Sequence, residues 1–145
     1  DGGGAIYTPE SSDMIQFCTI VENDLDQVLV YGSNSDVQIN NCIIASGISG
    51  LSIAVDASGQ ALATHCLFFG NPGGDMPQCD HFECIVADPL FCDDTMDNYT
   101  LCENADASPD VNMWGEQIGA YGIGCGWCES PVQATSWGHV KSLFR

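Results

Sequence analysis

Positive charge is almost missing from this chain. Its 145 residues contain two basic side chains, Lys141 and Arg145, against 20 Asp and Glu, which gives a formal net charge of −18. Nucleic acids and anionic membrane surfaces attract proteins through Lys and Arg, so we expect neither as a partner. Copies of such a chain repel one another, so any self-association would need screening by cations or strong short-range contacts.

Long apolar runs and helical periodicity are missing too. No apolar stretch approaches the roughly 20 residues of a transmembrane helix, so we expect no membrane insertion. No window before the last ten residues has the i, i+3, i+4, i+7 spacing of an amphipathic helix. The chain begins without Met or a charged segment followed by an apolar one, so any signal peptide has been removed or lies outside this sequence.

What the sequence contains instead is a series of short apolar stretches, at residues 14–21, 28–31, 37–45, 51–55 and 61–69. Gly, Asn, Ser and Asp bound them, which is typical of β-strands. Cys18, Cys42 and Cys66 stand 24 residues apart. A fixed period of about 20 to 50 residues indicates stacked repeats. Two or three strands per period without helices predict an all-β, right-handed parallel β-helix of about three to four 24-residue coils.

Equivalent residues of successive coils would stack about 4.8 Å apart, like on like. The expected interior columns are Cys18–Cys42–Cys66, Ile20–Ile44–Phe68 and Ile6–Val30–Ala54. A cysteine column is also a possible metal or redox site. We favour a packed core, because side chains of consecutive coils point the same way and three thiols cannot all pair.

Six more cysteines lie outside this register: Cys79, Cys84, Cys92, Cys102, Cys125 and Cys128. An even number in a segment rich in Gly, Pro, Asp and Asn predicts disulfides formed in an oxidising compartment. We expect a Cys92–Cys102 bond, with Cys79 and Cys84 bonded to each other or to Cys125 and Cys128. The less favoured alternative is a four-thiolate zinc site made from Cys79, Cys84, Cys125 and Cys128.

The composition divides the chain into three segments: coils in 1–71, a cysteine-rich cap in 72–128 and a tail in 129–145. The end of a β-helix exposes unpaired backbone groups and an open apolar interior, so solenoids carry atypical terminal repeats. We therefore expect the cap to close one end and the other end to stay open.

Several segments resemble secreted bacterial proteins with right-handed parallel β-helix repeats, of the pectin-lyase-like superfamily. The matching residues are 2–7, 18–23, 41–44 and 65–71 in the repeats, and 88–91, 98–101 and 118–122 in a closing segment. Residues 134–145 are similar to the linker that follows the cap in large surface-exposed members. The resemblance implies the C-terminal part of such a protein, outside the cell or on its surface. It indicates almost nothing about activity, since a fold does not imply a function.

The superfamily includes polysaccharide lyases and hydrolases, but these residues do not favour an enzyme. Lyases of this fold use Arg or Lys to remove a proton beside a uronate carboxylate, and the acidic body contains neither. Hydrolysis needs two carboxylates about 5 to 10 Å apart. Asp13 and Asp36 fall on adjacent coils and Asp24 and Asp26 are close in sequence, but no His or Arg stands beside them. We interpret His65 as an outward surface residue.

Two further groups carry possible binding chemistry. Asp88, Asp93, Asp94 and Asp97 crowd one segment and are a possible calcium site, since Ca²⁺ prefers oxygen ligands. Solvated acidic loops are the alternative, and we expect no other cofactor. The expected assembly tail consists of the apolar residues Trp137, Val140, Leu143 and Phe144 with the basic Lys141 and Arg145.

These features predict a non-enzymatic extracellular structural protein whose copies self-associate head to tail into a filament or surface layer. Such contacts do not close on themselves and so propagate. The tail would dock on a neighbouring copy or fold back on its own chain. The competing prediction is a monomeric adhesion or carbohydrate-binding module of a larger surface protein, with a glycan as its ligand.

Overall fold

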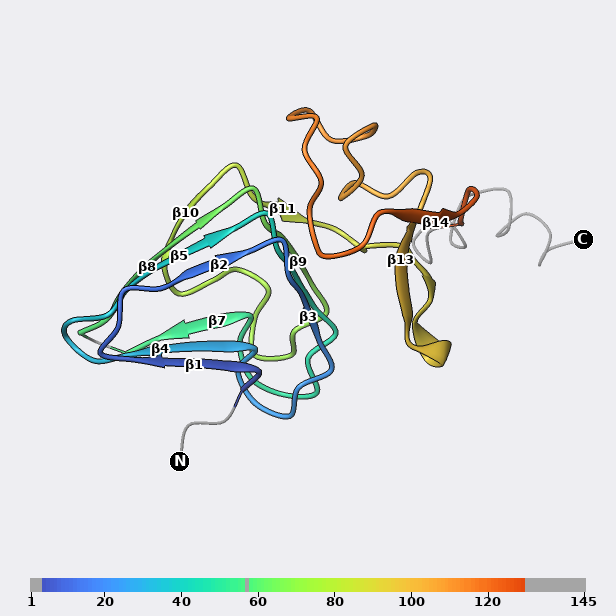
Figure 1. Ribbon diagram of the computed structural model, residues 1–145. Coiled ribbons are helices and arrows are strands. Elements are labelled where there is room, and N and C mark those ends of the chain that lie inside the picture. Colours follow the sequence, from blue (N-terminus) through green and yellow to red (C-terminus); the bar gives the residue numbers. More distant parts are fainter. Residues whose placement is uncertain (1–3, 57, 130–145) are drawn as a thin grey trace, which may run out of the picture.

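The computed structural model describes residues 4–56 and 58–129 (Figure 1). Short strands follow one another around a triangular coil, and each coil lies on the one before it. No helix in these residues is long and apolar enough to cross a membrane.

Three parallel sheets form the sides of the coil. The first side contains β1 (Ile6–Pro9), β4 (Val28–Tyr31) and β7 (Ile53–Val55). The second side contains β2 (Met14–Gln16), β5 (Asp36–Asn40), β8 (Gln60–Thr64) and β10 (Asp80–Phe82). The third side contains β3 (Thr19–Val21), β6 (Ile43–Ala45), β9 (Leu67–Phe69) and β11 (Ile85–Val86). The predicted all-β parallel β-helix is confirmed.

The 24-residue period holds on the second and third sides. Ile15 pairs with Ile39, which pairs with Ala63. The third side repeats this spacing in the column Ile20–Ile44–Phe68. All of these side chains are buried and belong to one interior apolar cluster. Period-two alternation therefore places one apolar set inside the coil at a constant spacing.

The first side departs from that period. Ile6 pairs with Val28 and Val28 with Ile53, at intervals of 22 and 25 residues. The expected column Ile6–Val30–Ala54 is therefore wrong, because Val30 pairs with Thr8. The loops that flank this side differ in length from coil to coil, and the register follows pairing and burial instead of the sequence interval.

A fourth coil, within the predicted three to four, follows the three that were assigned to residues 1–71. β10 pairs with β8 and β11 with β9, both in parallel. Cys84 follows Cys66 by 18 residues, yet it occupies the equivalent position, because the Ile85 N–H donates to the Cys66 carbonyl at 2.8 Å. The expected boundary at residue 71 therefore falls one coil too early.

The corner between the second and third sides is left-handed in every coil. Its residues are Phe17, Asn41, His65 and Glu83, each directly before a cysteine, with φ of 51°, 52°, 52° and 51°. This conformation costs residues other than glycine roughly 1–2 kcal/mol each. Only one of the four is Asn, so the stacked backbone hydrogen bonds impose the corner on whichever residue stands there.

A C-terminal segment follows the coils. It contains β12 (Phe91–Asp93), the short 3₁₀ helix η1 (Asp94–Met96), β13 (Asn98–Cys102) and β14 (Ile123–Cys125). β13 is antiparallel to β12 and parallel to β14. Its buried residues Leu101, Ala105, Ala107 and Ile118 pack against Ile43, Ala45 and Leu67 on the outer face of the third side.

This position differs from the expected one. In Figure 1 the segment lies beside the coil, next to β3 and β9. The expectation that residues 72–128 close one end is wrong for the described part of that segment. The physical reason is that Ile43, Ala45 and Leu67 make the third side apolar on its outer face as well, and covering them removes this surface from water.

Candidate functional site

Each sheet of the coil ends in an edge strand. On the side of the last coil these strands are β7, β10 and β11, and on the side of the first coil they are β1, β2 and β3. An edge strand presents unpaired backbone groups that can pair with another chain. The fourth coil is short because the chain crosses β7 early, where the Gln78 N–H donates to the Ile53 carbonyl at 3.0 Å.

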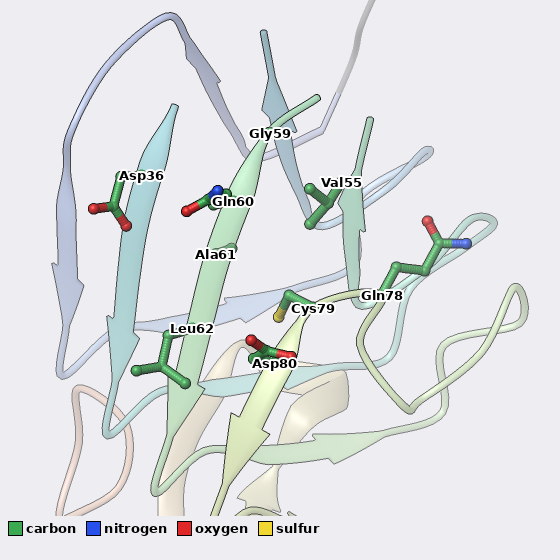
Figure 2. A pocket seen from close by; sticks show the side chains of 9 residues that line it. All are labelled: Asp36, Val55, Gly59, Gln60, Ala61, Leu62, Gln78, Cys79 and Asp80. Carbon is green, nitrogen blue, oxygen red and sulfur yellow. The ribbon is translucent and has the colours of Figure 1, made fainter. Parts of the chain in front are cut away.

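This shortcut leaves a cavity of about 480 Å³ at the end of the coil (Figure 2). Val55, Ala61 and Cys79 line it, and all three pack against the interior cluster while staying half-buried. The rest of its wall consists of the polar residues Asp36, Gln60, Gln78 and Asp80, together with Gly59 and the exposed Leu62. The cavity therefore extends from the open interior of the β-helix to outward-facing residues of the second side.

The outer face of the second side is an uncovered polar surface. Its exposed or half-buried amides are Gln16, Gln38, Asn40 and Gln60. Met14, Leu62 and Phe82 add exposed apolar side chains, and Asp36 and Asp80 add carboxylates. Figure 2 shows Asp36 and Gln60 next to one another on β5 and β8. Amides beside exposed apolar groups can hydrogen-bond and stack on a polar ligand, but residues 4–56 and 58–129 offer no Lys or Arg to bind an anion.

The cysteine column runs through four coils. Cys42 and Cys66 are fully buried, whereas Cys18 and Cys84 at its ends are half-buried. The thiols donate to carbonyls of the preceding coil: Cys42 to Ile15 at 3.7 Å, Cys66 to Ile39 at 3.4 Å and Cys84 to Ala63 at 3.6 Å. None of the four is in a disulfide.

The thiols of the column also influence one another. Hydrogen bonds to Cys42 and Cys84 hold the pKa of the Cys66 thiol far above its ordinary value. The hydrogen bond from Cys66 lowers the pKa of Cys84 to about 7 and lowers the pKa of Cys42 as well. Burial raises the pKa of Cys18. Within the column the thiolate is therefore disfavoured at Cys66 and favoured at Cys42 and Cys84.

The comparisons with known proteins agree with this architecture. The family model described as "right handed beta helix region" matches residues 1–84, which is more than half of the chain. The chain belongs to this right-handed β-helix family. No curated protein and no solved structure matches it. The match ends at the last cysteine of the column, so the family covers the coils and stops before the C-terminal segment.

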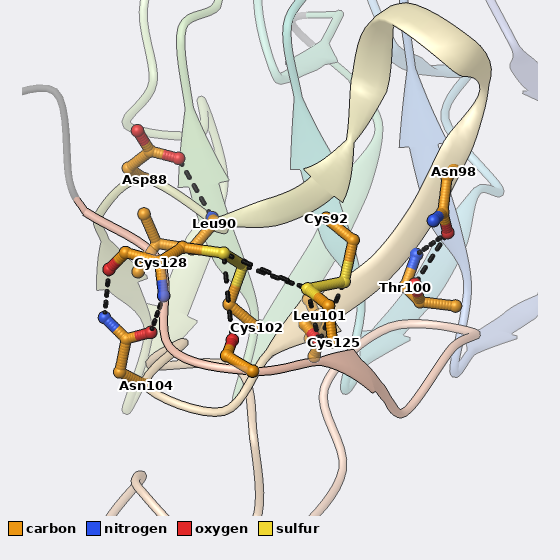
Figure 3. Close-up of a disulfide and its surroundings, with 11 residues drawn as sticks. Asp88, Leu90, Cys92, Asn98, Thr100, Leu101, Cys102, Asn104, Cys125 and Cys128 are labelled. Carbon is orange, nitrogen blue, oxygen red and sulfur yellow. Dashed lines mark hydrogen bonds between the residues drawn. A yellow bond between two sulfur atoms is a disulfide. The ribbon is translucent and has the colours of Figure 1, made fainter.

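In this β-helix the disulfides differ from the expected ones (Figure 3). Cys92 is bonded to Cys125 and Cys102 to Cys128. The expected Cys92–Cys102 bond is wrong, because β12 and β13 are held by backbone pairing while β14 lies on the other side of β13. Asn104 fixes the end of the segment, since it donates to the Cys128 carbonyl at 2.8 Å and accepts from the Cys128 N–H at 2.9 Å.

Cys79 and Cys84 take no part in the disulfides that were expected for them. Both are free thiols that pack against the β-helix interior. The zinc alternative fails on the same observation, since Cys125 and Cys128 are each bonded to another cysteine. The sequence contained a signal for the role of Cys84: Cys84-Ile85-Val86 repeats the pattern of Cys42-Ile43-Ile44, but at a shortened interval.

The four aspartates of the possible calcium site do not meet in the structure. Asp88 accepts from the Leu90 N–H, Asp93 from the Thr95 hydroxyl and Asp97 from the Tyr99 hydroxyl, so each serves its own turn. Among the described residues, the one group of three potential metal ligands within 4.8 Å is Cys92, Cys102 and Cys125, and these are in disulfides. The expected assembly tail lies outside the described residues.

His65 lies at the junction of the coil and the C-terminal segment. Its Nε2 is 2.7 Å from Glu83 Oε2 and its Nδ1 is 3.3 Å from Glu116 Oε2. Its ring stacks on Trp114 at a centroid distance of 4.7 Å. The Asn41 amide donates to Glu116 at 3.0 Å and, with His65, lowers the pKa of that carboxyl. His65 points outward as expected, but it is not a plain surface residue, because the loop that carries Trp114 and Glu116 packs on it. The alternation of residues in the strand could not reveal this loop.

Proposed function

We propose that this chain is a non-enzymatic structural β-helix, secreted by a bacterium or displayed on its surface, whose copies stack head to tail into a filament or layer. The edge strands at both ends of the described coils support this most directly. The C-terminal segment packs on the third side, so its described residues leave both ends accessible. The two disulfides fit an oxidising compartment outside the cell.

The ends match in the order of their strands. In each coil a strand of the first side is followed by one of the second and one of the third. A neighbouring copy stacked on the last coil would therefore bring its β2 to β10 and its β3 to β11, while its β1 would meet residues 74–78, which cross β7. This contact adds strands to two sheets at once and covers Val55, Ala61 and Cys79 in the cavity. The polar rim of the cavity would surround a buried apolar centre, as at other protein interfaces.

Charge sets the conditions for this contact. Two copies with a net charge of −18 each repel one another, and the Debye length shortens from about 30 Å at 0.01 M salt to about 8 Å at 0.15 M. Stacking should therefore increase with salt and with divalent cations. Calcium would act here by screening and bridging carboxylates, without a dedicated site.

The decisive experiment places a charge in the proposed contact. Val55→Asp puts a carboxylate at the end cavity, and Tyr31→Asp introduces the same group on the outer face of the first side, where Tyr31 is 50% exposed and lies outside the cavity. Wild type and Tyr31→Asp should form salt-dependent polymers by light scattering and electron microscopy, and Val55→Asp should stay monomeric while keeping the wild-type circular dichroism. Monodisperse wild type at every salt and calcium concentration would reject the proposal.

The amide face favours a second candidate, a module that binds an uncharged glycan. Among the described residues this face contains no Lys or Arg, and it combines four amides with the exposed ring of Phe82. Glycan-array binding that falls at least tenfold in Phe82→Ala or Gln38→Ala, in a protein that stays monomeric, would support this candidate. Unchanged binding in both variants would count against it. Tyr31→Ala, which removes an exposed ring on the first side, is the control.

A further inference from the structure

The four-coil cysteine column has a geometry that a packed core does not require. Cys18, Cys42, Cys66 and Cys84 follow equivalent left-handed corner residues and stack in register over four coils. All four are free thiols. Outside the column, Cys79 is also free, and the remaining cysteines form the two disulfides. We propose that these four thiols bind soft monovalent metal ions of the Cu(I) or Ag(I) class, one ion between each pair of neighbouring coils.

The spacing of the coils fits a two-coordinate ion. Neighbouring strands of a sheet lie about 4.8 Å apart, so equivalent side chains repeat at that distance. A metal–thiolate bond is about 2.3 Å long, so two such bonds in line span about 4.6 Å. Thiolates are soft ligands that select soft ions such as Cu(I). A linear ion between two stacked thiols therefore needs little movement of the backbone.

The same spacing argues against a tetrahedral site. Within the described residues, no three thiols of the column lie within 4.8 Å of one another. A column offers each ion one neighbour above and one below, which suits ions that accept two ligands. Zn²⁺, which requires four, has no such cage here.

The charge balance also favours monovalent ions. Each ion that binds replaces a thiol proton, so the column exchanges H⁺ for M⁺ and no electron is transferred. Four thiols joined by three monovalent ions, with one thiol proton retained, carry no net charge. That neutrality matters because Cys42 and Cys66 are fully buried, and an uncompensated charge there would be costly.

Ions can reach the column from its end. Cys84 is half-buried and lines a cavity of about 430 Å³ between the coil and the C-terminal segment. Asp106 lies in the wall of the same cavity, and the whole chain is strongly acidic, so cations are attracted to this opening.

Silver titration of the folded protein, with its disulfides intact, tests the proposal, since Ag(I) binds thiolates without redox cycling. In chloride-free buffer, native mass spectrometry should show three tightly bound ions, with about one proton released per ion. Cys66→Ala should bind one ion, between Cys18 and Cys42, because Cys84 loses its only neighbour within the column. Cys79→Ala, which removes a free thiol outside the column, should still bind three.

Cys18→Ala is a second variant in case Cys66→Ala does not fold, because Cys18 is half-buried at the other end of the column. This variant should bind two ions. Circular dichroism before and after titration confirms that each variant is folded. The proposal is overturned if folded wild type binds no ion, if Cys66→Ala and Cys18→Ala bind as many as wild type, or if Cys79→Ala loses ions. Zn²⁺ in excess should not displace the bound silver.

Discussion

His65 stacks on Trp114 across the junction between the coil and the C-terminal segment, with ring centroids 4.7 Å apart and planes inclined by 26°. One ring stands on the left-handed corner of the third coil and the other on a loop that is 49 residues further along. This pair, with the carboxylates of Glu83 and Glu116 on either side of the imidazole, holds the segment against the coil at a point away from the disulfides.

Trp114→Ala should therefore loosen the segment. Trp→Ala costs about 3–5 kcal/mol when the ring is fully buried, and Trp114 is half-buried, so we expect a loss of about 2 kcal/mol in the free energy of unfolding. Urea denaturation measures it. Trp114→Phe is the matched control: it keeps the stacked ring and removes an indole N–H that has no acceptor among residues 4–56 and 58–129. A Phe variant as unstable as the Ala variant would show that stacking is not what holds the loop.

The lowered pKa of Glu116 predicts a loss of stability in acid. The Asn41 amide and then His65 favour its carboxylate, so its pKa in the folded state lies below the ordinary value of 4.5. A depressed carboxyl pKa contributes stability above the unfolded value, and this contribution is lost as the pH falls through the folded value. Unfolding free energies measured from pH 6 to pH 3 should therefore fall less steeply in Glu116→Gln than in wild type. Parallel curves for the two proteins would contradict the role of this carboxylate.

The disulfide pairing is open to a direct chemical test. Alkylation of the unfolded, non-reduced chain should label Cys18, Cys42, Cys66, Cys79 and Cys84, and peptide mapping should recover Cys92 joined to Cys125 and Cys102 joined to Cys128. Cys92 and Cys125 are 33 residues apart, and a disulfide that closes a loop of that size stabilises a protein by about 3–4 kcal/mol. Replacing both by Ser should therefore lower the free energy of unfolding by about that amount. Recovery of a Cys92–Cys102 peptide would refute the pairing.

Gly47 should be intolerant of a side chain. Gln27 is fully buried and donates to the Ala45 carbonyl at 3.2 Å. Its side-chain amide also accepts from Asn23 and donates to Asn71, so it lies between these two residues. A Cβ at Gly47 would lie 2.9 Å from Gln27 Nε2. Gly47→Ala should cost about 1–3 kcal/mol, because overpacking displaces a buried hydrogen-bonded amide.

A matched control for this substitution lies in the C-terminal segment. Gly126→Ala adds the same methyl group where no atom lies within 4 Å, so its midpoint in urea should stay close to that of wild type. Equal effects of the two substitutions would mean that glycine entropy, and not the packing around Gln27, sets the stability change.

The periodic part of the fold could be predicted from the sequence because the period and the burial pattern agree. Cys42, Ile44 and Phe68 are all interior, as their spacing implied, since residues at equal positions of equal coils must face the same way. Prediction failed where coils change length. Ile6 pairs with Val28 instead of Val30, and Cys84 joins the column at an interval of 18, because hydrogen bonds between coils outweigh a fixed count of residues.

The candidate sites divide in the same way. The cysteine column was visible as a repeat, but the shortened coil that opens the cavity at Val55, Ala61 and Cys79 was not. The aspartates from Asp88 to Asp97 were close in sequence, yet each accepts a hydrogen bond within its own turn. Closeness in sequence does not bring ligands together, because each short acidic loop can satisfy its carboxylates locally.

Composition and period alone determined that this chain is an acidic all-β solenoid with a row of cysteines inside, since alternating apolar residues at a constant interval can be buried in only one way. The tertiary structure decided which cysteines bond, how many coils there are and where the C-terminal segment lies. Those outcomes depend on contacts between residues far apart in the chain: β14 pairs with β13, and the same segment packs on Ile43, Ala45 and Leu67. No local pattern encodes that contact.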